Sequence, residues 1–197
     1  MIAVVAVLSS PALMADPLVD LRKAVPDAVV EMRYAGPENF LGRALYCRPA
    51  AFLRRSSAEK LAKAASSLRA KGLRLIVFDA YRPLSVQRLL WKAKPDSRFV
   101  APPDRGSAHN RGGAVDAGLC DAAGRALIMP SAFDEFGPSA AHDAPGASPR
   151  ARANARILKA AMEAAGFAAL ASEWWHYRDP ASKDWPLLDI PLEKLFP

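Results

Sequence analysis

Apolar residues recur at helical spacing in two long stretches of the chain, residues 57–71 and 149–165. Ser56 and Glu59 have the spacing of a capping box at the start of the first stretch, and Ser148 is a capping residue for the second. A glycine follows each stretch and can end a helix there. We therefore predict two long amphipathic helices.

Shorter apolar runs predict strands between and after these helices. Residues 73–81 are typical of a buried strand, and a short helix over 85–93 follows, with Leu89 among its inward residues. Residues 114–119 predict a strand that returns over 125–129 as a hairpin, and residues 167–177 predict a last strand pair or a bent strand. Because strands and helices do not alternate strictly, the pattern favours a single α+β domain with helices packed against one antiparallel sheet.

The first fifteen residues are almost all small and apolar, and they resemble the core and cleavage end of a secretory signal peptide, with Ala15 as its last residue. A positively charged leader is missing, and the run is too short to span a membrane. The alternative is a strand or helix packed on the domain. We expect a signal-peptide remnant over 1–15, a domain over 17–197, and a periplasmic or secreted protein, with a cytoplasmic location as the alternative.

Composition narrows the classes of function. The chain has 197 residues, 51% of them apolar, which is enough for a sizeable core. The net charge of +7 is spread along the chain, and no basic stripe alternates with aromatic residues, so we expect no nucleic-acid partner. We also expect no stable membrane anchor. Cys47 and Cys120 cannot form a cysteine-only zinc site; they form either one disulfide or two buried thiols.

Two of the three histidines lie in dense polar and aromatic motifs. His109 precedes Asp116 within a glycine-containing segment, and His176 lies in the sequence Glu-Trp-Trp-His-Tyr that begins at Glu173. Two histidines and one carboxylate, with an open position for water, are the ligand set of a catalytic zinc site. His142 stands alone in an irregular stretch, and we interpret it as a surface or pocket-rim residue.

Glu173 is available as a general base beside that metal. On an ideal strand, residues three apart face opposite ways, so convergence of Glu173 and His176 requires a bulge or a strand start. Arg82 follows the buried strand in the motif Asp-Ala-Tyr-Arg-Pro. Its guanidinium is suited either to stabilising an oxyanion or to a structural salt bridge.

These three motifs together, residues 79–83, 107–116 and 173–177, resemble those of the D-alanyl-D-alanine dipeptidases, a zinc D,D-peptidase family. The likeness extends from about Leu18 to Tyr177. It implies that the protein hydrolyses the D-alanyl-D-alanine dipeptide with one Zn²⁺ per chain. The implied site residues are the metal ligands His109, Asp116 and His176, the base Glu173, the intermediate-stabilising Arg82, and the substrate-binding Tyr34, Ser107, Asp134 and Tyr46.

Within the resemblance, Tyr34 and Asp134 bind the substrate ammonium group and Ser107 its carboxylate, while Tyr46 lies in the pocket. Ala117 and Gly118 replace larger residues of the family pattern. Two other functions share the same metal site: a D,D-carboxypeptidase or endopeptidase on longer peptidoglycan peptides, and a non-catalytic zinc-stabilised binding module. Salvage of D-alanine, cell-wall turnover and glycopeptide resistance are all compatible with the chemistry, and the pattern leaves the oligomeric state open.

Overall fold

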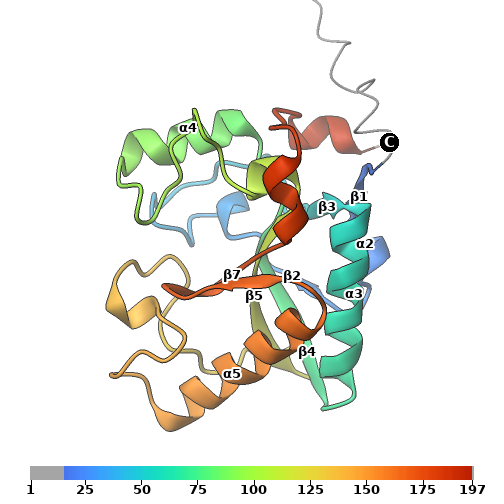
Figure 1. Ribbon diagram of the computed structural model, residues 1–197, viewed down its shortest axis with the longest axis vertical. Helices are drawn as coiled ribbons and strands as arrows, with labels where there is room; N and C mark the ends of the chain where they lie inside the picture. Colours follow the sequence, from blue (N-terminus) through green and yellow to red (C-terminus); the bar gives the residue numbers. More distant parts are fainter. Residues whose placement is uncertain (1–15, 197) are drawn as a thin grey trace, which may run out of the picture.

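The fold is organised around a five-stranded sheet (Figure 1), and the computed structural model describes residues 16–196. The predicted signal-peptide segment, residues 1–15, lies outside the described residues. The strands are β1 (Leu18–Asp20), β2 (Val29–Val30), β3 (Phe52–Arg54), β4 (Leu73–Asp79), β5 (Ala114–Asp121), β6 (Ala168–Leu170) and β7 (Glu173–Arg178). The main sheet has the order β2-β4-β5-β7-β6, and β1 pairs with β3 in a separate antiparallel ribbon.

The main sheet is antiparallel except at one edge. β4, β5, β7 and β6 pair antiparallel in that order, whereas β2 runs parallel to β4. The prediction of an α+β domain is confirmed, and the prediction of a wholly antiparallel sheet is wrong at this edge. The reason is the connection between β2 and β4, which contains a helix and returns the chain in its original direction.

The two long predicted helices are present as α3 (Arg55–Arg69) and α5 (Pro149–Ala164), which pack against each other and against the sheet (Figure 1). The Ser148 side chain caps α5 by accepting a hydrogen bond from the Ala151 N–H. The predicted capping box of α3 is wrong. Asp16 supplies the carboxylate instead, accepting from the Ser56 N–H at 3.0 Å and from its hydroxyl at 2.7 Å.

Shorter elements complete the described chain. They are the helices α2 (Leu21–Ala24) and α4 (Leu84–Ala93) and the 3-10 helices Arg33–Ala35, His109–Arg111, Pro138–Ala140, Pro180–Asp184 and Leu192–Leu195. The predicted helix over 85–93 is confirmed as α4, but Leu89 is 42% exposed rather than buried. After the turn that follows β5, the predicted return strand over 125–129 is reduced to a single bridge between Ala126 and Cys120.

Small residues allow the strands to approach the aromatic core closely. A Cβ atom on Gly118 would lie 2.9 Å from the ring of Phe78, which itself packs edge-on against Trp174. The glycine that departs from the family pattern therefore makes room for this ring pair. Both cysteines are free, so of the two alternatives the structure has thiols rather than a disulfide, with Cys120 buried as expected and Cys47 exposed. Among the described residues, no helix is long and apolar enough to cross a membrane.

An ion pair between buried Asp179 and partly exposed Lys60 fixes the end of β7 against α3. Asp179, fully buried, accepts hydrogen bonds from Lys60 Nζ at 2.7 Å and from the Ser57 hydroxyl at 3.0 Å. It also accepts from the Ala181 N–H. Removal of Lys60 or Ser57 would leave the buried Asp179 carboxylate without its full set of partners, which is costly. These contacts therefore hold the end of β7 in place against α3.

We predict that Asp179→Asn lowers the free energy of unfolding by roughly 1–3 kcal/mol, because the ion pair with Lys60 is lost while the side chain stays buried. Urea denaturation at neutral pH measures the change. The matched control is Asp184→Asn, since the side chain of Asp184 is 78% exposed. Equal stability of the two variants would contradict the role given to Asp179.

Candidate metal centre

Strand pairing brings the predicted metal ligands together. Asp116 of β5 is the direct register partner of His176 of β7, so the two side chains leave adjacent strands at the same level. His109 lies in the 3-10 helix just before β5. Gly112 joins that helix to the strand at φ +72°, where a Cβ would lie 2.7 Å from Leu18, so this tight turn requires glycine.

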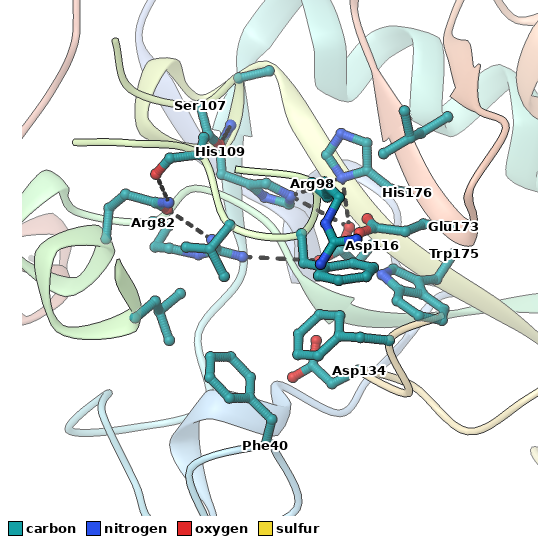
Figure 2. Close-up of a pocket in the computed structure, with 18 of the residues that line it drawn as sticks. Phe40, Arg82, Arg98, Ser107, His109, Asp116, Asp134, Glu173, Trp175 and His176 are labelled. Atoms are coloured by element: carbon teal, nitrogen blue, oxygen red, sulfur yellow. Dashed lines mark hydrogen bonds and ion pairs between the residues drawn. The ribbon is translucent and has the colours of Figure 1, made fainter. Parts of the chain in front are cut away.

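The ligand atoms converge as a zinc site demands (Figure 2). His176 Nδ1 lies 2.9 Å from Asp116 Oδ1 and 3.2 Å from His109 Nε2. His109 Nε2 lies 3.3 Å from the same oxygen of Asp116. Zinc–ligand bonds of about 2.0–2.1 Å in a tetrahedron place neighbouring ligand atoms about 3.3 Å apart. Two imidazole nitrogens and one carboxylate oxygen crowded in this way fit Zn²⁺.

Contacts around the ligands prepare them for a cation. His109 Nδ1 makes a 2.7 Å hydrogen bond with the carbonyl oxygen of Ala80, which leaves Nε2 facing the site. Burial alone would raise the pKa of Asp116, but the charges and hydrogen bonds of His109 and His176 outweigh it and hold this pKa below its ordinary value. The carboxylate is therefore ionised and ready to bind a metal.

Glu173 lines the same cavity as the three ligands because β7 begins at this residue and pairs irregularly there. The register between β6 and β7 shifts at Ala169 and Leu170, with Leu170 opposite Glu173. This irregularity meets the predicted need for a bulge or strand start. Burial raises the pKa of Glu173 to about 7, although the neighbouring His176 opposes the shift.

Arg82 is held in a buried frame and also lines the cavity. Its Nε and Nη2 donate to one carboxylate oxygen of Asp79 at 2.9 and 2.7 Å, and its Nη1 donates to Gln87 Oε1 at 2.8 Å. Nη2 lies 4.0 Å from Asp116. The two interpretations of Arg82 are thus compatible, because the salt bridge orients a guanidinium that faces the site.

The residues expected to bind substrate divide into two groups. Tyr34, Ser107 and Asp134 line the cavity, whereas Tyr46 is not among its lining residues. The Tyr34 hydroxyl donates to Asp134 at 2.9 Å, and burial, followed by the charge of Asp116, raises the pKa of Asp134 to about 7. The Tyr46 hydroxyl instead donates to Asp79 at 2.7 Å, so Tyr46 supports the frame that holds Arg82.

The cavity measures about 310 Å³, the size of a site for a small ligand. Figure 2 shows Ser107 and Asp134 on opposite sides of the metal ligands. The structure adds lining residues that the sequence analysis missed, namely Gln87, Arg98 and Arg178 with the aromatic residues Phe40, Phe99 and Phe136. Phe40 lies in the segment 33–42, which also resembles the family, whereas the other five lie outside the motifs and no local signal marked them.

His142 is buried, at 8% exposure, and its ring packs edge-on against Tyr177. The interpretation of His142 as a surface or rim residue is therefore wrong, because the irregular segment around it folds onto β7. The residue is also absent from the cavity lining, which makes it a useful control histidine.

Comparisons with known proteins show which family the chain is similar to. Residues 14–190 match a family model described as D-ala-D-ala dipeptidase, Peptidase_M15. The chain is 39% identical to a D-alanyl-D-alanine dipeptidase of Escherichia coli over 87% of this chain and 89% of that protein. It is 32% identical to a D-alanyl-D-alanine dipeptidase of Enterococcus faecium over 61% of this chain and 69% of that protein. A solved structure of the vancomycin resistance D,D-pentapeptidase VanY with Zn(II) overlaps at a TM-score of 0.42 and 20% identity, over 66% of this chain and 73% of that chain.

We predict that His109→Ala and His176→Ala each weaken zinc binding by more than about a hundredfold, because each removes one of three protein ligands. His142→Ala should retain one zinc per chain. Metal content after dialysis and the rise in melting temperature on adding zinc measure the difference, since a metal that binds only the folded state stabilises it. Full zinc content in the His109 variant would contradict the assignment.

We also predict a pH-dependent gain in stability from Glu173→Gln in the metal-free protein. A carboxyl whose pKa is about 7 when folded and near 4.3 when unfolded binds more protons in the folded state between these values. The free energy of unfolding therefore falls as pH rises through this window. The metal-free variant should be more stable than the metal-free wild type above pH 7, by roughly 1–3 kcal/mol, with no difference near pH 4.

Urea denaturation in the presence of a chelator at several pH values tests this, with the exposed Glu59→Gln as the control. A pH-independent difference would mean that the substitution acts through packing rather than through the charge.

Proposed function

The chain belongs to the D-ala-D-ala dipeptidase family, and from this membership and the geometry of the site we propose the mechanism and substrate range of its reaction. The protein is a zinc metallopeptidase that hydrolyses the D-alanyl-D-alanine dipeptide to two D-alanine molecules. One observation carries the mechanism: Glu173 and Arg82 line the same small cavity as the three metal ligands.

His109, Asp116 and His176 hold the zinc. When bound, zinc lowers the pKa of water and polarises the peptide carbonyl. Glu173 accepts the proton of the attacking water and then delivers it to the nitrogen of the leaving amine. Its buried position, which raises its pKa to about 7, suits a group that must both take and release a proton near neutral pH.

Arg82 donates hydrogen bonds to the carbonyl oxygen as negative charge develops on it. Asp79 and Gln87 hold the guanidinium in place before the substrate arrives, so no reorganisation is needed during the reaction. The buried Asp79 balances the charge of Arg82 on the side away from the cavity.

The free amino group of the substrate is bound by Asp134 and Tyr34. A buried carboxylate gains most from a cationic partner, and the substrate ammonium supplies one within the cavity. Ser107 lies on the opposite side of the metal ligands and contributes to binding the substrate carboxylate (Figure 2). A peptide extended at its amino end would displace the ammonium from Asp134, which disfavours the D,D-carboxypeptidase and endopeptidase alternative.

We propose that the protein is exported, with a cytoplasmic location as the alternative. The apolar segment 1–15 supports export, with residues 17–197 as the mature domain in the periplasm or outside the cell. Hydrolysis there would release D-alanine from cell-wall-derived dipeptide.

We predict that zinc-loaded protein releases D-alanine from D-alanyl-D-alanine, while Glu173→Gln lowers kcat by about 10²–10⁴-fold and Arg82→Ala by about 10²–10³-fold. Zinc content and melting temperature serve as controls for both variants. N-acetylation of the substrate should abolish most turnover, because it removes the charge that binds Asp134. Equal cleavage of the free and N-acetylated substrates would instead favour the carboxypeptidase or endopeptidase.

A further inference from the structure

We propose that Arg98 binds the free carboxylate of the substrate and thereby restricts the site to substrates that end one residue after the bond that is cleaved. This inference rests on the proposed dipeptidase function and names a specificity residue for it. Arg98 belongs to the loop between α4 and the 3-10 helix of His109, and it lines the same cavity as the metal ligands.

The dipeptide substrate carries a charge at each end, an ammonium group and a carboxylate. Two extended residues span about 7 Å, so the ammonium and the carboxylate of a dipeptide both lie within or at the mouth of the cavity. A carboxylate removed from water is costly unless a cation or several hydrogen-bond donors receive it. Ser107 offers one hydroxyl, which already accepts a hydrogen bond from the His109 N–H at 3.0 Å.

Few side chains of the cavity can supply the positive charge that this carboxylate needs. Besides the histidines, three positive side chains line the cavity, Arg82, Arg98 and Arg178. Each of the three nitrogens of Arg82 already donates a hydrogen bond to Asp79 or Gln87, and its cavity face serves the carbonyl oxygen. The substrate carboxylate is thus left to Arg98 or Arg178.

Contacts with Asp96 and Phe99 distinguish Arg98 from Arg178. The side chain of Arg98 is 77% exposed, and Asp96 orients it by accepting from Nε at 2.9 Å and from Nη2 at 2.6 Å, while its guanidinium lies 5.3 Å from the ring centre of Phe99. Within residues 16–196, Nη1 of Arg98 has no hydrogen-bond partner, so it is available to a ligand. Arg178 has no ion pair in the same range, so no carboxylate orients it. A guanidinium that a neighbouring carboxylate already orients loses less entropy when it binds a second carboxylate, which favours Arg98.

Gln87 links the loop of Arg98 to the reacting centre. Gln87 accepts from Arg82 through its oxygen and donates to the Ala101 carbonyl through its nitrogen at 2.8 Å. Phe99 packs against Phe136 at 5.0 Å between ring centres. The side chain of Gln87 therefore positions both Arg82 and the loop that carries Arg98. In Figure 2 the Arg98 side chain overlaps the metal ligands, and Asp134 is drawn apart from them.

The test compares D-alanyl-D-alanine with its C-terminal amide. The wild-type protein should prefer the free acid in kcat/KM by about tenfold to a hundredfold, the range of one charge-assisted hydrogen-bond pair. Arg98→Ala should lose this preference by slowing the free acid alone, and Arg98→Lys should keep part of it. Arg105→Ala is the matched control, because Arg105 is exposed on the same loop and does not line the cavity.

Two results would overturn the proposal. One is an equal loss by Arg98→Ala on acid and amide, which would indicate only a structural role for the loop. The other is that Arg178→Ala loses the preference for the free acid over the amide while Arg98→Ala keeps it.

Calorimetric binding to zinc-loaded Glu173→Gln protein gives a readout that does not require turnover. Adding Arg98→Ala to the Glu173→Gln protein should weaken its affinity for D-alanyl-D-alanine by about tenfold or more. Adding Arg105→Ala instead should leave this affinity unchanged. If the wild-type protein cleaves neither substrate, the proposed function fails, and this binding difference still decides for or against Arg98.

Discussion

The pairing of β5 with β7 is the constraint on which the rest of the site depends. It places Asp116 opposite His176 at one level of the sheet, although sixty residues separate them in the chain. The short turn at Gly112 then needs only to deliver His109 to the same point. The ion pair of buried Asp179 with Lys60 holds the end of β7, so the contact that fixes the strand also fixes the metal ligand His176 that the strand carries.

Around this centre the protein buries more carboxylates than it neutralises with its own cations. Asp79 is matched by Arg82, and Asp116 by the histidines, but Glu173 and Asp134 have their pKa values raised to about 7 by burial. Such groups cost stability in the free protein at neutral pH. Zinc and the substrate ammonium each supply a positive charge near these carboxylates. The same buried carboxylates therefore lower the stability of the free protein and strengthen the binding of zinc and substrate.

Local patterns predicted what depends on local interactions. The apolar periodicity of α3 and α5 predicted both helices, and Ser148 caps α5 as expected, because helix formation and capping involve residues a few positions apart. The failures have non-local causes. Asp16 replaces the expected capping box of α3, β2 joins the sheet in parallel, and His142 is buried because an irregular segment folds onto Tyr177.

The sequence by itself determined the helices, the α+β class and the metal-ligand set, because residue type and spacing within the motifs limit which chemistry they can perform. Only the tertiary structure decided that Tyr46 supports Arg82 from behind the cavity and that Gln87 joins Arg82 to the loop of Arg98. These roles depend on the direction of single hydrogen bonds between distant segments. Such directions follow from how the sheet and loops pack, and residue spacing does not encode them.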